Sequence, residues 1–297
     1  MAWTTADLLT AIKNSQMFPD ASNNSLSSAS LLQFATEELY ITVLPMIQGL
    51  REKYYEKYLD TAYTTSTPSM NIPSRSVGQT LSVVQFIVGT YIKCLEPIDP
   101  GAIASTNPTN EPANFYFENN TIVFYPPPVA SNGTVRMRYF QRPNRLEQTS
   151  NCAQITAWNS GTGVVTCTPV STWTTSQTFE FIPQTASQAT PYGIGSAPSA
   201  ISGTTMTFSL STADAAKVTV GDWIALAEYT PIPEIPFELQ PVLMQATCCR
   251  GLAARNDQTA LASAKSILAE YMTAATKLLT PRDVGGNKRV VSNWRRF

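Results

Sequence analysis

The stretch from Phe237 to Pro281 reads FELQPVLMQATCCRGLAARNDQTALASAKSILAEYMTAATKLLTP. In both halves, apolar residues recur at three- and four-residue spacing, which is typical of amphipathic helices. The polar turn Arg255-Asn256-Asp257 supplies a break and a cap for the second helix, and the final proline is expected to stop it. Alanine is frequent in both halves, so we expect the two helices to pack closely as a hairpin. The stretch contains no recognisable chemical motif.

The N-terminal part also predicts helices. Thr4 and Asp7 have the spacing of a capping box that opens a short helix. Ser27 or the following serine caps a second, strongly periodic helix. Pro45 is expected to kink or divide it, because proline removes one hydrogen bond and clashes with the preceding turn. We predict that the helix then continues over Met46–Tyr58.

Short strands are predicted after these helices. One ambiguous segment favours strands at Leu81–Val84 and Phe86–Tyr91 over a helix. The clearest β signal is Phe115–Phe124, where aromatic and β-branched runs flank an Asn-Asn pair that tolerates the positive φ of a tight turn. In the next strand Arg136 and Arg138 alternate with apolar residues. A solvent-facing position is therefore favoured over a phosphate-binding one.

Residues 148–230 differ in composition from the rest of the chain. Short apolar runs are separated by Gly, Ser and Thr at intervals typical of a β-barrel or sandwich. We interpret this stretch as a small β domain inserted into a core made of residues 1–147 and 231–281, with residues 282–297 as an extended C-terminal arm. The predicted fold class is α+β: a helical-bundle core with a small β-hairpin or sheet element, an inserted all-β domain and the arm.

Charge is spread unevenly over the 297 residues, although the net charge is only −1. Residues 282–297 hold five basic side chains and one acidic side chain, a net charge of +4, which leaves −5 for residues 1–281. A basic arm on an acidic body predicts binding to an acidic surface of a protein or nucleic acid. The body itself is not a nucleic-acid binder by charge.

The arm also carries large apolar side chains, which a tail of low hydrophobicity would lack. They are Val290, Val291, Trp294 and Phe297. We expect the arm to add to a partner's surface by strand pairing and by these anchors. The alternative is a tail that folds back on its own domain.

The sequence contains no histidine. This excludes Ser-His-Asp and Cys-His nucleophile systems, His-containing zinc sites and imidazole acid–base chemistry. The five cysteines show no C-x-x-C spacing, so neither a zinc ribbon nor a disulfide framework is expected. Cys152 and Cys167 could face each other across a hairpin, but small buried hydrophobes are the favoured interpretation.

Motifs for phosphate and dinucleotide binding are also missing from the sequence. We therefore predict no enzyme activity, no metal site and no cofactor. Because no segment approaches the ~20 apolar residues of a membrane helix and no signal peptide is recognisable, we expect a soluble protein made in a reducing compartment.

Several segments together resemble the head-to-tail adaptor (connector) proteins of tailed bacteriophages. They are Ser27–Glu38, Ile72-Pro73, the hairpin Phe115–Pro126 leading into Thr134–Tyr139 and Arg142-Pro143, and the helix pair ending at Tyr271. The resemblance covers most of residues 1–143 and 231–281. The chain departs from it at residues 148–230, which resemble the β insertions of longer adaptors in short-tailed phages.

The resemblance implies a helical core assembled as a homo-oligomeric ring, typically a dodecamer, in the neck of the virion. DNA would pass through the ring during ejection without sequence-specific binding, and the protein would be made in the host cytoplasm. The implied partners are the portal protein, the tail nozzle or tail tube protein and tail fibres. The implied portal-binding residues are Lys288, Arg289, Val290, Val291, Trp294, Arg295, Arg296 and Phe297. The implied ring-forming residues are Leu239, Leu243, Ala246, Arg250, Leu261, Leu268 and Tyr271.

Two other functions stay open on the sequence. One is another tail component, such as a stopper or nozzle. The other is a β-domain module that binds carbohydrate or a host receptor. In that module Trp158, Trp173 and Trp223 would stack on sugars, although core packing is favoured for at least two of them.

Overall fold

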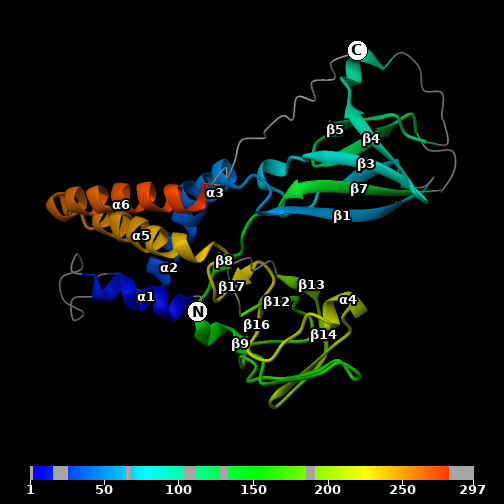
Figure 1. Cartoon of the computed structure of the whole chain (residues 1–297). Coiled ribbons are helices and arrows are strands. Elements are labelled where there is room, and N and C mark those ends of the chain that lie inside the picture. Colours follow the sequence, from blue (N-terminus) through cyan, green and yellow to red (C-terminus); the bar gives the residue numbers. More distant parts are fainter. Residues whose placement is uncertain are drawn as a thin grey trace, which may run out of the picture. The chain divides into compact units, whose positions relative to one another are not determined.

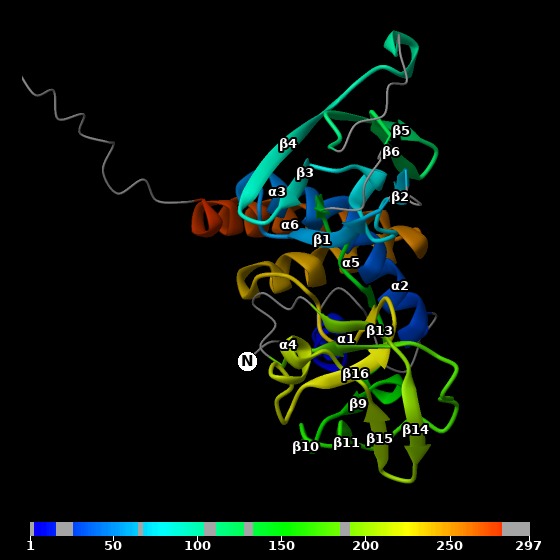
Figure 2. The same cartoon turned by 90° about the vertical axis from the view of Figure 1, so that its right-hand side faces the viewer.

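The computed structural model describes residues 3–15, 26–64, 68–103, 111–127, 133–184 and 191–280. Contacts divide the chain into two compact units: unit 1 holds the residues up to Arg51 and from Arg145 onward, and unit 2 holds Glu52–Asn144. Helices and strands are both plentiful, as an α+β chain requires (Figures 1 and 2). Residues 148–230 fall in the same unit as the helices. Their separation as an inserted domain stays a prediction.

Unit 1 begins with helices whose starts follow local capping signals. α1 (Thr5–Asn14) opens with the predicted capping box, in which the Asp7 N–H donates to Thr4 Oγ1 at 3.2 Å and the Thr4 N–H donates to Asp7 Oδ2 at 2.9 Å. α2 (Ser28–Glu38) is capped by Ser27, whose hydroxyl accepts from a backbone N–H three residues on at 3.1 Å. These local hydrogen bonds fix where each helix begins.

The division predicted at Pro45 takes the form of a π turn rather than a break. α2 continues into a π-helical turn, η1 (Leu39–Val43), and then into α3 (Leu44–Leu50). The Leu44 N–H donates to the Leu39 carbonyl, one residue farther back than in an α-helix. The wider turn relieves the clash that a proline ring makes with a regular α-helical turn.

The helix predicted over Met46–Tyr58 is wrong beyond Leu50. Arg51 leaves the helical region, with φ −139° and ψ 76°. β1 (Glu56–Tyr63) then begins inside the predicted helix and pairs with β7 (Gly133–Phe140) over its whole length. The mixed charges of this stretch fit either structure, and the distant partner strand decides between them.

The helix hairpin near the C-terminus is confirmed. η6 (Phe237–Leu239), a 3-10 turn, leads into α5 (Gln240–Ala254), and α6 (Gln258–Leu279) packs against α5. Asp257 caps α6 by accepting from the Ala260 N–H at 3.0 Å. α1 and α2 also contact α5, which is why most of α5 is buried.

Unit 2 is built on a curled seven-stranded sheet in the order β1-β7-β3-β4-β5-β6-β2 (Figure 1). Its other strands are β2 (Ser69–Asn71), β3 (Val83–Val88), β4 (Tyr91–Pro97), β5 (Asn114–Glu118) and β6 (Thr121–Tyr125). β4 and β5 pair in parallel, whereas the other neighbouring strands of this sheet pair antiparallel. The β part of the protein is therefore larger than the small element predicted from the sequence.

Turn residues explain which strand predictions in unit 2 succeeded. The Asn-Asn hairpin is confirmed, with Asn119 at φ 53° between β5 and β6. The strands predicted at Leu81–Val84 and Phe86–Tyr91 are instead β3, followed by a turn at Gly89-Thr90 and then β4. Gly89 has φ 57°, a conformation that glycine adopts readily, so the chain reverses there.

The two arginines of β7 lie on the face away from the core, as predicted. Val135 and Met137, which alternate with them, are buried. Arg136 Nε lies 2.7 Å from Asp60 Oδ1, and its guanidinium carbon is 4.4 Å from the ring centre of Tyr58. The hydrogen bond from Arg136 lowers the pKa of the Asp60 carboxyl. This arginine is therefore engaged within the sheet.

The described part of residues 148–230 is mainly β, with a 3-10 turn, η4 (Thr149–Asn151), and a short α-helix, α4 (Thr212–Ala215). Two four-stranded sheets have the orders β13-β12-β16-β9 and β10-β11-β15-β14. Their strands are β9 (Ala153–Gln154), β10 (Ala157–Asn159), β11 (Val164–Thr166), β12 (Phe179–Ile182), β13 (Tyr192–Ser196), β14 (Pro198–Ser202), β15 (Thr205–Phe208) and β16 (Trp223–Leu226). One core joins Phe179 and Phe181 of the first sheet to Met206 and Phe208 of the second. This arrangement is sandwich-like.

The tryptophans of this β region pack inward. Trp173 is 7% exposed and meets Phe179 edge-on, with ring centres 4.8 Å apart. Trp158 and Trp223 are partly buried against apolar clusters. Core packing of these side chains is therefore confirmed, and it opposes the idea that they stack on sugars.

Two turn glycines provide a test of the β region. Gly163 has φ 70°, and a Cβ there would collide with the Phe208 carbonyl oxygen, whereas Gly203 has φ 55° and no described atom within 4 Å of a Cβ. Gly203→Ala should cost about 1–2 kcal/mol of unfolding free energy, from backbone strain alone. Gly163→Ala should cost about 3 kcal/mol or more, because the collision adds to the same strain. Urea denaturation of both variants measures the difference, and equal losses would contradict the packing of Gly163.

Candidate functional site

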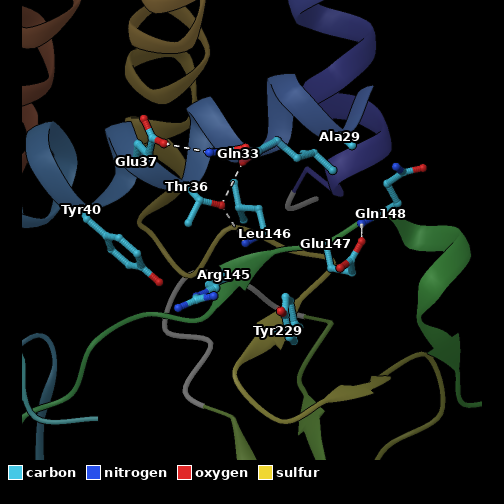
Figure 3. Close-up of a pocket in the computed structure, with 11 residues that line it drawn as sticks. Ala29, Gln33, Thr36, Glu37, Tyr40, Arg145, Leu146, Glu147, Gln148 and Tyr229 are labelled. Carbon is cyan, nitrogen blue, oxygen red and sulfur yellow. Dashed lines mark hydrogen bonds between the residues drawn. The ribbon is translucent and has the colours of Figure 1, made fainter. Parts of the chain in front are cut away.

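A groove in unit 1 lies between α2 and the start of the β region (Figure 3). Its volume is about 430 Å³, within the ~300–1,000 Å³ usual for ligand-binding clefts. Two short strands that pair in parallel, β8 (Arg145–Leu146) and β17 (Tyr229–Thr230), lie beside it. The lining residues of this α2 groove are Ala29, Leu32, Gln33, Thr36, Glu37, Tyr40, Arg145, Leu146, Glu147, Gln148 and Tyr229.

The helical repeat decides which side chains of α2 and η1 reach the groove. Ala29, Gln33, Thr36 and Tyr40 follow one another at intervals of four, three and four residues, which places them on one face. The other face of α2 is buried within unit 1, where Ala35 is fully covered and the helix contacts α5. α2 therefore connects the helix hairpin on one side to the groove on the other.

Hydrogen bonds hold the strand against the helix at the floor of the groove. The Leu146 N–H donates to Thr36 Oγ1 at 3.1 Å (Figure 3). The N–H groups of Arg145 and Glu147 point the other way and donate to carbonyls on or next to β17, both at 2.9 Å. Thr5 Oγ1 of α1 donates to the Glu147 carbonyl at 2.6 Å. The groove is thus built where segments distant in sequence are bonded together.

Arg250 of α5 fixes the charges along α2. Its guanidinium contacts Glu37 and lies 3.3 Å from Glu38 Oε1, with its carbon 5.9 Å from the ring centre of Phe34. Gln33 Nε2 also donates to Glu37 Oε1, at 3.2 Å. The Glu37 carboxylate therefore lines the groove in a defined position.

A smaller hollow of about 190 Å³ adjoins the groove, because Glu147 and Tyr229 line both. The other residues of this Trp173 hollow are Asn151, Val170, Thr172, Trp173 and Leu226. Groove and hollow together offer carboxylates beside aromatic and aliphatic surface. That combination suits an extended peptide with basic and large apolar side chains.

Most residues predicted to form a ring are engaged inside unit 1. The buried ones are Leu239, Leu243, Ala246 and Leu261. Arg250 is bound to the glutamates of α2, and Leu268 is partly buried against the cluster between α5 and α6. Tyr271, at 38%, is the most exposed of the set. Ring formation by these residues stays a prediction, and the predicted portal-binding arm, Lys288–Phe297, lies outside the described residues.

Sequence reasoning missed the groove. Its helical side carries a visible signal, because Ala29, Gln33, Thr36 and Tyr40 share one face of a helix whose opposite face is apolar. The strand side of the groove carries no sequence signal, because β8 is two residues long and shows no periodicity. The pairing of that strand with β17 is visible in the structure alone.

The described residues give no indication of a catalytic or metal centre. No group of three His, Cys, Asp or Glu side chains among them could hold a metal ion. All five cysteines are free, and burial raises the pKa of the Cys167 and Cys248 thiols to about 11. Cys152 and Cys167 are buried, as interpreted from the sequence, whereas Cys94 is exposed. Of the helices that the structure describes, none is long and apolar enough to cross a membrane.

Comparison with known protein families gives a match over the N-terminal half of the chain. The sequence model of the family described as SU10 adaptor protein matches residues 3–164, more than half of the chain. The matched segment contains α1, α2, α3, all of unit 2 and every lining residue of the α2 groove except Tyr229. No curated protein sequence matches the chain.

The floor of the groove can be tested at Thr36. Thr36→Val keeps the side-chain shape but removes the acceptor of the Leu146 N–H, so unfolding free energy should fall by about 1–2 kcal/mol. Thr273→Val on α6 is the matched control, because both hydroxyls donate to a carbonyl four residues back but that of Thr273 has no cross-segment bond described. The control should stay within about 0.5 kcal/mol of the parent in urea denaturation. Equal effects of the two changes would contradict a structural role for the helix–strand bond.

Proposed function

The chain belongs to the SU10 adaptor protein family, and from this premise we propose that it joins the portal to the tail of a phage, around the DNA channel. Membership makes it an adaptor, a structural component of the virion. The observation that carries the proposal is the family match across residues 3–164. The α5–α6 hairpin lies outside that match, and its resemblance to the helix pair of head-to-tail adaptors supports the proposal separately.

We propose that copies of the chain close into a ring, with the helices of unit 1 as its helical-bundle core and α6 as a contact surface. Tyr271 and Leu278 of α6 are 38% and 65% exposed. Exposed large apolar side chains mark association surfaces. Small side chains on α6, including Ser266, Ala269 and Ala274, line a shallow depression where another backbone can approach. A dodecamer is the ring size that the resemblance implies.

The β region and the arm supply the two ends of the proposed connection. Residues 148–230 have an apolar core of their own, which supports a long-form adaptor whose β region meets the nozzle, the tail tube or the fibres. The arm Lys288–Phe297 would dock into the portal, as its basic charge and its aromatic anchors suggest. The net charge of −5 on residues 1–281 suits a channel through which DNA slides, because tight phosphate contacts would oppose transit.

A stopper or nozzle subunit is the remaining structural alternative. Binding to the portal is expected of the adaptor, so a portal-binding measurement distinguishes the two. The carbohydrate-binding alternative has less support, since Trp158, Trp173 and Trp223 pack against apolar clusters.

Mass measurement by light scattering tests the proposed function. The purified protein should be a monomer alone and should form a closed ring when mixed with the portal of the same phage. The ring should appear as a step in mass at the portal's own elution position. A protein that stays monomeric beside the portal would contradict the adaptor role.

Single changes in the arm test how it docks. Trp294→Ala should weaken portal binding about tenfold or more, because buried aromatic anchors dominate interface energetics. Arg282→Ala removes a charge outside the predicted anchors and should change the affinity less. Titration of the portal with each variant measures both affinities, and a larger loss for Arg282→Ala would overturn the assignment of Trp294 as an anchor.

A further inference from the structure

The α2 groove and the Trp173 hollow present a surface that needs a particular kind of occupant. The carboxylates of Glu37 and Glu147 line the groove together with the guanidinium of Arg145, and Glu37 is also ion-paired with Arg250 of α5. Tyr40 and Tyr229 supply aromatic surface, and the hollow adds an indole and aliphatic side chains. The floor is closed by the helix–strand hydrogen bond. A segment with positive charge and large apolar side chains complements this surface.

The chain contains one such segment after the last described residue. Residues 282–297 read RDVGGNKRVVSNWRRF, with five basic residues against one acidic residue. Trp294 and Phe297 provide aromatic side chains for the hollow, and the net charge of +4 opposes the −5 of residues 1–281. Charge and aromatic content thus favour this segment as the occupant.

The segment is also long enough to reach the groove of its own chain. Gln245 Nε2 donates to the Ala264 carbonyl at 3.1 Å, so these positions lie level in the antiparallel pair of α5 and α6. Counting residues along the two antiparallel helices from this pair places Phe237 of η6 level with Met272 of α6. The seven residues of α6 that follow Met272 therefore extend about 10 Å past η6, at about 1.5 Å per residue.

From η6 back to Tyr229, on the groove, the chain covers at most about 28 Å, at about 3.5 Å per residue. The spacing between the two helix axes adds about 10 Å. Residues 282–297 span up to about 50 Å when extended, at about 3.3 Å per residue. The three distances from the end of α6 to Tyr229 together set an upper limit on the path to the groove. The extended length of residues 282–297 matches this limit.

From these observations we propose that, in the free protein, residues 282–297 occupy the α2 groove of their own chain. The basic side chains lie beside Glu37 and Glu147, and an aromatic side chain enters the Trp173 hollow. The inference rests on the proposed function in one respect: the arm must leave the groove before it can dock into a portal. The groove would thus hold the arm in reserve until the portal competes for it.

Limited proteolysis of the full-length protein tests this without a portal. The rate of trypsin cleavage after Arg289 is followed by mass spectrometry and compared with the rate in a free peptide of residues 282–297. In the parent protein this cleavage should be at least tenfold slower than in the peptide. Protection should be independent of protein concentration, because the occupied groove belongs to the same chain.

Two matched tryptophan substitutions locate the source of protection. Ala29 is exposed and lines the groove, so Ala29→Trp should fill it and restore cleavage to near the peptide's rate. Ala262 is equally an exposed helical alanine, but it lies on α6 outside the groove, and Ala262→Trp should keep the parent's protection. Thermal melts check that both variants fold. If Ala29→Trp does not fold, Gln33→Trp at a second exposed lining position replaces it.

Three outcomes would overturn the inference. They are cleavage of the parent arm at the peptide's rate, unchanged protection when the groove is filled, and protection that depends on concentration. Portal binding is measured separately. If the arm is protected but no portal binds, the docking role fails and the groove assignment stands. If the portal binds an unprotected arm, the groove assignment alone fails.

Discussion

The parallel pairing of β8 with β17 is the constraint on which unit 1 depends. It places Arg145 beside Tyr229 and Leu146 beside Thr230, so the chain enters and leaves the β region at the same place. A segment whose two ends meet can fold around its own core without displacing what precedes and follows it. The Leu146 N–H, on the other edge of β8, is bonded to Thr36 of α2, and this fastens the entry point to the helices. The groove exists because the strand meets the helix there.

The sequence predicted those features that short-range hydrogen bonds decide. The capping residues Thr4, Ser27 and Asp257 each start a helix where the pattern placed it. Asn119 turns the hairpin between β5 and β6 because asparagine tolerates positive φ. In these cases the residues that determine the conformation are within a few positions of one another. The same holds for the α5–α6 hairpin, whose two helices are neighbours in sequence.

Features that depend on distant partners could not be predicted in the same way. Residues 56–58 have no strong local preference, and β1 forms because β7, more than seventy residues later, pairs with it. β7 also pairs with β3, an order that no alternation pattern specifies. The resemblance implies a ring-forming role for Arg250, and the structure shows this side chain bound to Glu37 and Glu38, more than two hundred residues earlier, which no sequence pattern indicates. The groove has the same origin, since two of its sides are far apart in sequence.

An arm with two possible sites has a consequence for assembly. If the groove holds the arm in nine of ten free molecules, the affinity of a single arm for the portal falls about tenfold, because one molecule in ten is competent to bind. Once a first copy is docked, a neighbour held by ring contacts presents its arm at a high effective concentration, and the same tenfold loss is then easily overcome. Docking of a lone copy on the portal is thereby disfavoured more than docking of a copy that joins a growing ring. Occupancy of the groove would make docking of the arms depend on contact between copies, which a permanently free arm could not do.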